Sequence, residues 1–94
     1  MGRMDSLHTV LPRALLHLFQ QGPMSQGKLE AAWRVAVGDA ISRISTVHLR
    51  ADGSVEVSAA DQRWQRELKR SSHHILSKLN ALLGAQAIDK LHVK

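Results

Sequence analysis

Hydrophobic residues along the chain predict helices first, then two strands, a long helix and a last strand. Over residues 10–21 apolar positions recur every three or four residues, as on one face of an α-helix that Thr9 is suited to cap. After a Gly-Pro pair, Ser25 is a suitable N-cap for a second helix over residues 26–44. Gly38 interrupts this second pattern, so we expect either a bend or the close approach of another backbone there.

The period then changes from helical to two, which is typical of strands. Apolar and polar residues alternate over 46–50 and 54–58, and this pattern predicts a hairpin. A two-residue loop would mix apolar and polar residues on one face, whereas a three-residue loop with Gly53 in the left-handed conformation would not. The expected cross-strand pairs are Leu49 with Val55, Val47 with Val57 and His48 with Glu56.

Residues 60–83 are predicted to form one long helix with an apolar face and a basic face. The apolar positions are Trp64, Leu68, Ile75, Leu79 and Leu82. The basic positions lie roughly 200° round the helix and are Arg63, Arg66, Arg70, His74 and Lys78. Two serines fall on or beside the apolar line, so a break is expected near residues 71–73, and Gly84 is expected to end the helix.

The predicted order of elements is α-α-β-β-α-β, because residues 88–94 alternate once more with Leu91 and Val93 on one side. This order indicates a two-layer α+β domain over residues 1–94, with the helices on one face of a three-stranded sheet and residues 1–8 flexible. The uncovered face of the sheet should be polar. Its expected residues are His48, Arg50, Glu56, Lys90, His92 and Lys94.

Composition and charge indicate an anionic partner. Thirteen Lys and Arg against eight Asp and Glu give a net charge of +5, which favours nucleic acid or an acidic protein surface. The three aromatic residues are too few for a base-stacking platform, so binding to nucleic acid should depend on phosphates. No stretch is long and apolar enough for a membrane helix and no signal peptide is evident, so we expect a cytoplasmic protein without a membrane partner.

Candidate catalytic and metal-binding groups are scattered. Cysteine is absent, and the adjacent pair His73 and His74 would point about 100° apart on a helix, so neither a metal nor another cofactor is expected. The carboxylates show no paired spacing and there is no phosphate-binding glycine loop. We therefore expect no enzyme and no small-molecule substrate.

The two tryptophans and the basic face each allow two interpretations. Trp33 and Trp64 both lie on apolar helical faces and are expected in the core, but Trp64 lies among Arg63 and Arg66 and could anchor a protein interface. The basic face could be an ordinary solvated surface, or it could contact nucleic acid or an acidic partner.

Several short motifs, taken in order, resemble those of the DciA family of bacterial proteins. They are Trp33 with Val37-Gly38, Asp52-Gly53 with Val55-Glu56-Val57, Trp64 with Glu67-Leu68, and Leu79-Asn80 with Leu83-Gly84. The resemblance covers nearly the whole chain. It implies a KH-like domain that acts with the replicative helicase DnaB, helps it onto DNA at the start of replication and itself binds DNA.

The sequence departs from related proteins in two ways. The Gly-x-x-Gly loop with which KH domains clamp nucleotides is not present near residues 71–74, so RNA gripping of that kind is not expected. Many family members carry a disordered basic tail, which is expected to be absent here because the sequence stops at Lys94. If a tail was removed instead, the affinity for DNA should be lower than that of the whole protein.

The leading hypothesis is a helicase-loading accessory domain with weak, non-sequence-specific binding to single-stranded or duplex DNA. The expected DNA-binding residues are Arg50, Arg63, Arg66, Lys69, Arg70, Lys78 and Lys90. The expected partner-binding residues are Trp64 and His74. The two alternative functions are an adaptor that binds only protein, and an RNA-binding or ribosome-associated KH-like module.

Overall fold

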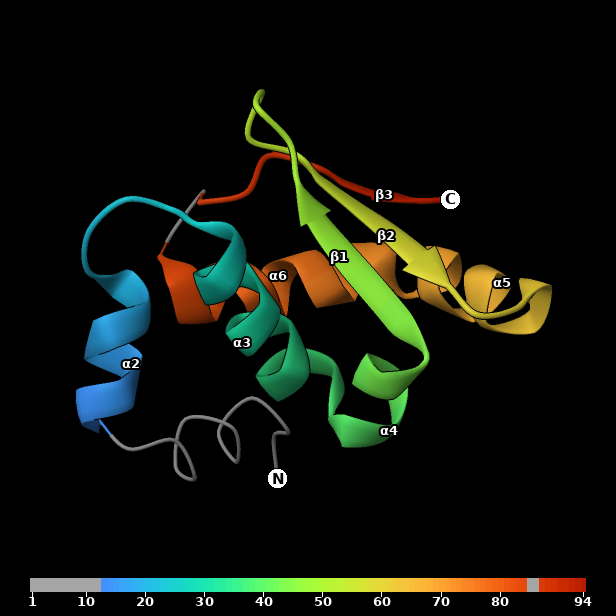
Figure 1. The fold of residues 1–94 in the computed structure, drawn as a ribbon, viewed down its shortest axis with the longest axis horizontal. Helices are drawn as coiled ribbons and strands as arrows, with labels where there is room; N and C mark the ends of the chain where they lie inside the picture. The colour runs from blue at the N-terminus through green and yellow to red at the C-terminus, as the bar shows by residue number, and fades with distance from the viewer. Residues whose placement is uncertain (1–12, 85–86) are drawn as a thin grey trace.

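A computed structural model describes residues 13–84 and 87–94 and confirms an α+β fold in which helices pack on a three-stranded sheet (Figure 1). The elements in order are α2 (Arg13–Gln20), α3 (Gln26–Val37), α4 (Asp39–Arg43), β1 (Ser45–Leu49), β2 (Val55–Ala59), α5 (Gln62–Arg70), α6 (Ser72–Leu83) and β3 (Leu91–Val93). The predicted order is confirmed, except that the second and third predicted helices are each divided in two. The proposed cap Thr9 lies outside the described residues.

The hairpin has the register that the alternation predicts. Strands β1 and β2 are antiparallel, and Leu49 faces Val55, Val47 faces Val57 and His48 faces Glu56. The amide of Arg50 donates to the carbonyl of Ser54 at 2.9 Å, which leaves a loop of three residues between them. Gly53 in this loop has a φ of 90°, a conformation that L side chains rarely adopt.

Strand β3 lies beside β2 and parallel to it, so the sheet order is β1-β2-β3. A parallel neighbour requires a long crossover, and α5 and α6 provide it. The side chain of Asn80 fixes the segment between α6 and β3. Its Nδ2 donates to the carbonyl of Ile88 at 3.2 Å, and its Oδ1 accepts from the amide of Ile88 at 2.9 Å. The segment that leads into β3 is thereby tied to α6.

The break at Gly38 is a helix end rather than a close approach of another backbone. Gly38 has a φ of 90° and a ψ of 165°, and a Cβ built there would meet nothing within 4 Å. Helix α3 therefore stops and α4 starts immediately, with Arg34 Nε donating across the break to Asp39 Oδ1 at 2.8 Å. The guanidinium of Arg34 lowers the pKa of the exposed Asp39 carboxyl, first through this hydrogen bond and then through its charge.

The long helix is also divided, and the break that the sequence predicted near residues 71–73 is confirmed. Helix α5 ends at Arg70, and its C-cap Ser71 has a φ of −94° and a ψ of 4° and donates its amide to the carbonyl of Glu67 at 3.1 Å. Helix α6 starts at the next residue. The break lies where serines occupy the apolar line, as the sequence indicated, and Gly84 ends α6 with a φ of 115°.

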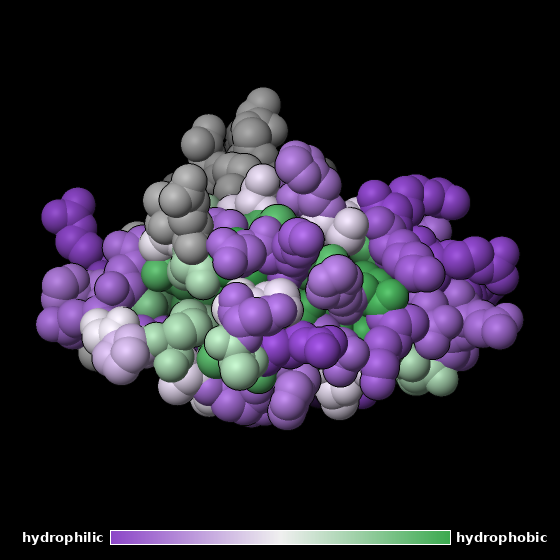
Figure 2. Space-filling view, turned by 90° about the horizontal axis from the view of Figure 1, so that it is seen from above, coloured by the Kyte–Doolittle hydropathy of each residue, from purple (hydrophilic) through white to green (hydrophobic). Residues whose placement is uncertain are grey.

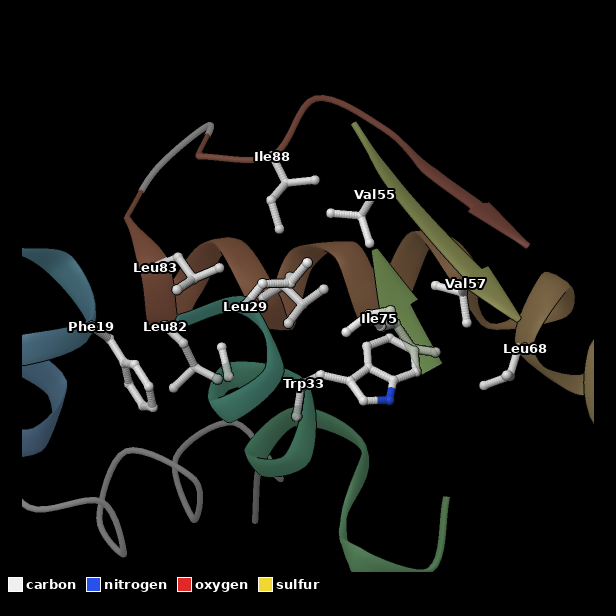
Figure 3. Close-up of a cluster of buried hydrophobic side chains, with 14 residues drawn as sticks. Phe19, Leu29, Trp33, Val55, Val57, Leu68, Ile75, Leu82, Leu83 and Ile88 are labelled. Atoms are coloured by element: carbon white, nitrogen blue, oxygen red, sulfur yellow. The ribbon is translucent and has the colours of Figure 1, made fainter. Parts of the chain in front are cut away.

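The core lies between the sheet and the helices α3, α5 and α6 (Figure 3). Leu29, Leu79 and Val57 are fully enclosed, and Trp33, with 3% of its surface exposed, confirms the expected core tryptophan. The opposite face of the sheet carries the exposed residues His48 and His92. Burial on one face and exposure on the other follow directly from the alternation along each strand.

Candidate nucleic-acid and partner interface

Helix α5 presents a cluster of exposed cations. Asp61 caps the helix by accepting the amide of Trp64 at 3.0 Å, and Leu68, 2% exposed, fixes the buried side. The exposed side carries Arg63, Arg66, Lys69 and Arg70. The end of the molecule at which α5 lies is accordingly hydrophilic (Figures 1 and 2). We call these four residues the α5 cationic cluster.

Most of the α5 cationic cluster has no ion-pair partner among the described residues. Arg70 Nη1 lies 3.6 Å from Glu67 Oε1, and the two side chains are 78% and 50% exposed, so this pair contributes little to stability. Among the described residues, no carboxylate lies within ion-pair distance of Arg63, Arg66 or Lys69. These three side chains are available to an external anion.

A groove of about 230 Å³ lies beside this cluster and contains Trp64. Its apolar lining comes from α3 and α4 on one side and from α5 and α6 on the other, with Ala36, Val37, Ile41, Leu68 and Ile75. His74 and Lys78 also line it, as do Glu67 and Ser71. The indole of Trp64 is only half-buried, in contrast with Trp33, because the groove leaves part of it uncovered. We call this depression the Trp64 groove.

The structure divides the basic face that the sequence placed on one helix. Arg63, Arg66 and Arg70 are exposed on α5, whereas His74 and Lys78 lie on α6, beyond the break at Ser71, and line the Trp64 groove. Trp64 and His74, the expected partner-binding residues, are thus brought to the same groove. Val37 and Ile41 complete it from α3 and α4, and no sequence signal associated them with Trp64.

The other two expected DNA-binding residues, Arg50 and Lys90, belong to the exposed face of the sheet. Arg50 Nη1 lies 3.2 Å from Glu56 Oε2, and Lys94 Nζ lies 3.8 Å from Glu56 Oε1. One carboxylate is therefore shared by two cations, and Arg50 is partly neutralised. Lys90 is exposed and makes no ion pair with the part of the chain that the structure describes.

Across residues 13–84 and 87–94, no three His, Asp or Glu side chains gather closely enough to hold a metal ion. Within the same residues, none of the helices has the length and apolar character that a membrane span requires.

The link between α5 and α6 is Ser71 alone. This link is too short for the nucleotide-clamping loop of KH domains.

Comparison with known proteins identifies one family. The model of the family described as "Dna[CI] antecedent, DciA" matches residues 6–93, which is nearly the whole chain. No curated protein sequence matches the chain significantly.

Proposed function

Because the chain belongs to the DciA family, whose role in DNA replication is of the helicase-loader type, we propose that it binds the replicative helicase DnaB and assists its loading onto DNA. In this proposal the two surfaces described above have different tasks. The Trp64 groove contacts the helicase, and the α5 cationic cluster contacts DNA.

The half-buried indole of Trp64 is the observation that supports the helicase contact. A large aromatic side chain in a groove with an apolar lining is typical of the few residues that dominate the affinity of protein interfaces. His74 and Lys78, in the same groove, add polar and charged groups that would orient a partner. Trp33 offers no such surface, because it is buried.

The α5 cationic cluster supports the DNA contact. Exposed guanidinium and ammonium groups without internal partners can neutralise phosphates and release counterions, which gives affinity without reading sequence. Within residues 13–84 and 87–94, Arg63, Arg66 and Lys69 meet this description. We expect weak binding that falls steeply with salt.

The deciding experiment measures binding to purified, nuclease-treated DnaB. Trp64→Ala should weaken this binding about thirtyfold, the usual cost of losing a dominant interface residue, and should leave DNA affinity within about twofold. Gln65→Ala is the matched control, because Gln65 is the neighbouring half-buried residue on α5 and does not line the groove. A folded Trp64→Ala variant that binds DnaB like the wild type would contradict the groove as the helicase contact.

A protein-only adaptor is distinguished by reversing charges on α5. If DNA is a ligand, replacing both Arg66 and Arg70 by Glu should abolish DNA binding and leave DnaB binding intact. The opposite result would assign the α5 cationic cluster to an acidic surface of the helicase.

A further inference from the structure

The two edge strands of the sheet, β1 and β3, differ in whether their outward backbone groups are hydrogen-bonded. The outer edge of β1 is closed by a side chain: Gln26 Nε2 donates to the carbonyl of Val47 at 2.8 Å, and Gln26 Oε1 accepts from the amide of Leu49 at 2.8 Å. The carboxamide thus imitates the groups of a neighbouring strand. Closing an edge in this way prevents another chain from pairing with it.

The outer edge of β3 has no such cover among the described residues. The carbonyl of Lys90 accepts from Val55, and the amide of Lys94 donates to Val57, so the even-numbered residues of this segment bond to β2. In a parallel ladder the residues between them point their amides and carbonyls the other way. Leu91 and Val93 therefore direct their backbone groups outward, and within residues 13–84 and 87–94 nothing pairs with them.

A depression of about 220 Å³ lies between β3 and α6. Ser72, His73 and Leu76 line it from α6, and residues 89–92 line it from the β3 side. Leu76 and Leu91 are half-buried and supply apolar surface. Asp89 is the one acid in this lining, and its carboxylate lies against the hairpin loop, where a Cβ on Gly53 would be 3.6 Å from its Oδ2.

We propose that an extended, acidic segment of a partner protein adds to the open edge of β3 as a fourth strand. The backbone groups of Leu91 and Val93 would hold its main chain, and an apolar side chain would enter the depression beside Leu76. Strand addition next to a helix is an established mode of peptide recognition. This inference does not depend on the identity of DnaB as a partner or on the Trp64 groove.

The charges along β3 select an acidic segment over a second copy of the chain. Lys90 and Lys94 are exposed cations that alternate with the core-facing Leu91 and Val93, so they share the outer face of the sheet, where Lys94 Nζ also lies 3.8 Å from Glu56 Oε1. Two copies paired through β3 would place these groups near their own counterparts, and like charges across strands are destabilising. Glutamates on the matching face of the added strand would instead be attracted.

The test uses a fluorescein-labelled synthetic octapeptide in which glutamate alternates with valine. We expect it to bind, and the same peptide with lysine in place of glutamate to bind at least tenfold more weakly. With the glutamate peptide at about ten times its dissociation constant, hydrogen exchange at the amides of Leu91 and Val93 should slow about tenfold. The amide of Leu49, already closed by Gln26, serves as the unchanged reference.

Two variants separate strand addition from charge attraction alone. Val93→Pro removes an outward amide while the bonds of its neighbours to β2 are kept, and proline is tolerated at an edge of this kind. It should abolish peptide binding, with retained exchange protection at Lys94 showing that β3 is intact. Peptides N-methylated on the valines alone or on the glutamates alone should differ, because only one set of amides faces β3.

Three results would overturn the proposal: no binding at millimolar peptide, binding that Val93→Pro leaves unchanged in an intact β3, or a dimer through β3 in sedimentation of the chain alone. Trp64→Ala, which changes no charge, should leave peptide binding within about twofold. A negative result for strand addition can therefore be distinguished from a negative result for the proposed function.

Discussion

The indole Nε1 of Trp33 donates a 3.0 Å hydrogen bond to Ser45 Oγ, joining the buried face of α3 to the first residue of β1. Ser45 Oγ in turn donates to the carbonyl of Ile41 at 2.6 Å, so one hydroxyl also ties α4 to the sheet. Since Trp33 and Ser45 are both buried, neither group can turn to water instead.

Ser45→Ala should therefore lower the free energy of unfolding by about 1–3 kcal/mol, because it leaves the buried indole N–H without an acceptor. Urea denaturation followed by tryptophan fluorescence measures the change. A double-mutant cycle with Trp33→Phe isolates the hydrogen bond. Additive effects of the two substitutions would show that the bond contributes nothing of its own.

Gly38→Ala should destabilise the domain by about 1–3 kcal/mol, because its φ of 90° and ψ of 165° form a region that is essentially restricted to glycine. Gly27→Ala is the matched substitution within α3, where a Cβ also meets nothing within 4 Å and φ is not positive. It should stabilise by roughly 0.5 kcal/mol. Chemical denaturation of both variants compares them, and equal effects would exclude backbone strain at Gly38.

Asp52 should make the domain less stable in acid. Hydrogen bonds from the Ser54 hydroxyl and then from the Ser54 amide lower the pKa of the Asp52 carboxyl from 3.8. A lowered pKa in the folded state gives stability that is present above 3.8 and is lost as the pH falls through the folded value. Thermal melts of the wild type and of Asp52→Asn should differ most near neutral pH, and the difference should shrink as the pH falls below 3.8 and through the folded pKa.

Ser54→Ala removes the leading cause of the lowered pKa of Asp52. It should therefore reduce the loss of thermal stability that the wild type shows as the pH falls into the acid range. A difference between the wild type and Asp52→Asn that stays constant from neutral pH to acid would show that Asp52 does not titrate with an altered pKa.

Arg63→Ala and Arg66→Ala should each reduce the slope of log affinity against log salt for duplex DNA by roughly 0.9, because each contact releases about one condensed counterion. Fluorescence anisotropy over a salt series measures this slope. Arg13→Ala is the control, since Arg13 is an exposed arginine on α2, away from α5. Slopes that do not depend on these residues would exclude the α5 cationic cluster as the DNA contact.

Local features of the fold could be read from the chain because each depends on residues close together in sequence. Ser25 accepts the amide of Lys28 at 3.2 Å as the expected N-cap, and Gly84 ends α6. The hairpin register follows from alternation plus the conformation of Gly53, because a slip of one residue would move every apolar side chain to the wrong face. Three residues of the α5 cationic cluster, Arg63, Arg66 and Arg70, were identified from helical spacing in the same way.

Only the tertiary structure decided how distant segments meet. No residue pattern encodes the parallel pairing of β3 with β2, the closure of β1 by Gln26 or the meeting of Val37 and Ile41 with Trp64, because these depend on how α3, α5 and α6 pack together. Packing likewise determined the place of His74 and Lys78: they were expected on the basic stripe, and they line the Trp64 groove together with residues of α3 and α4. Hydrophobic periodicity determines which face of an element is buried, whereas packing between elements determines which residues become neighbours.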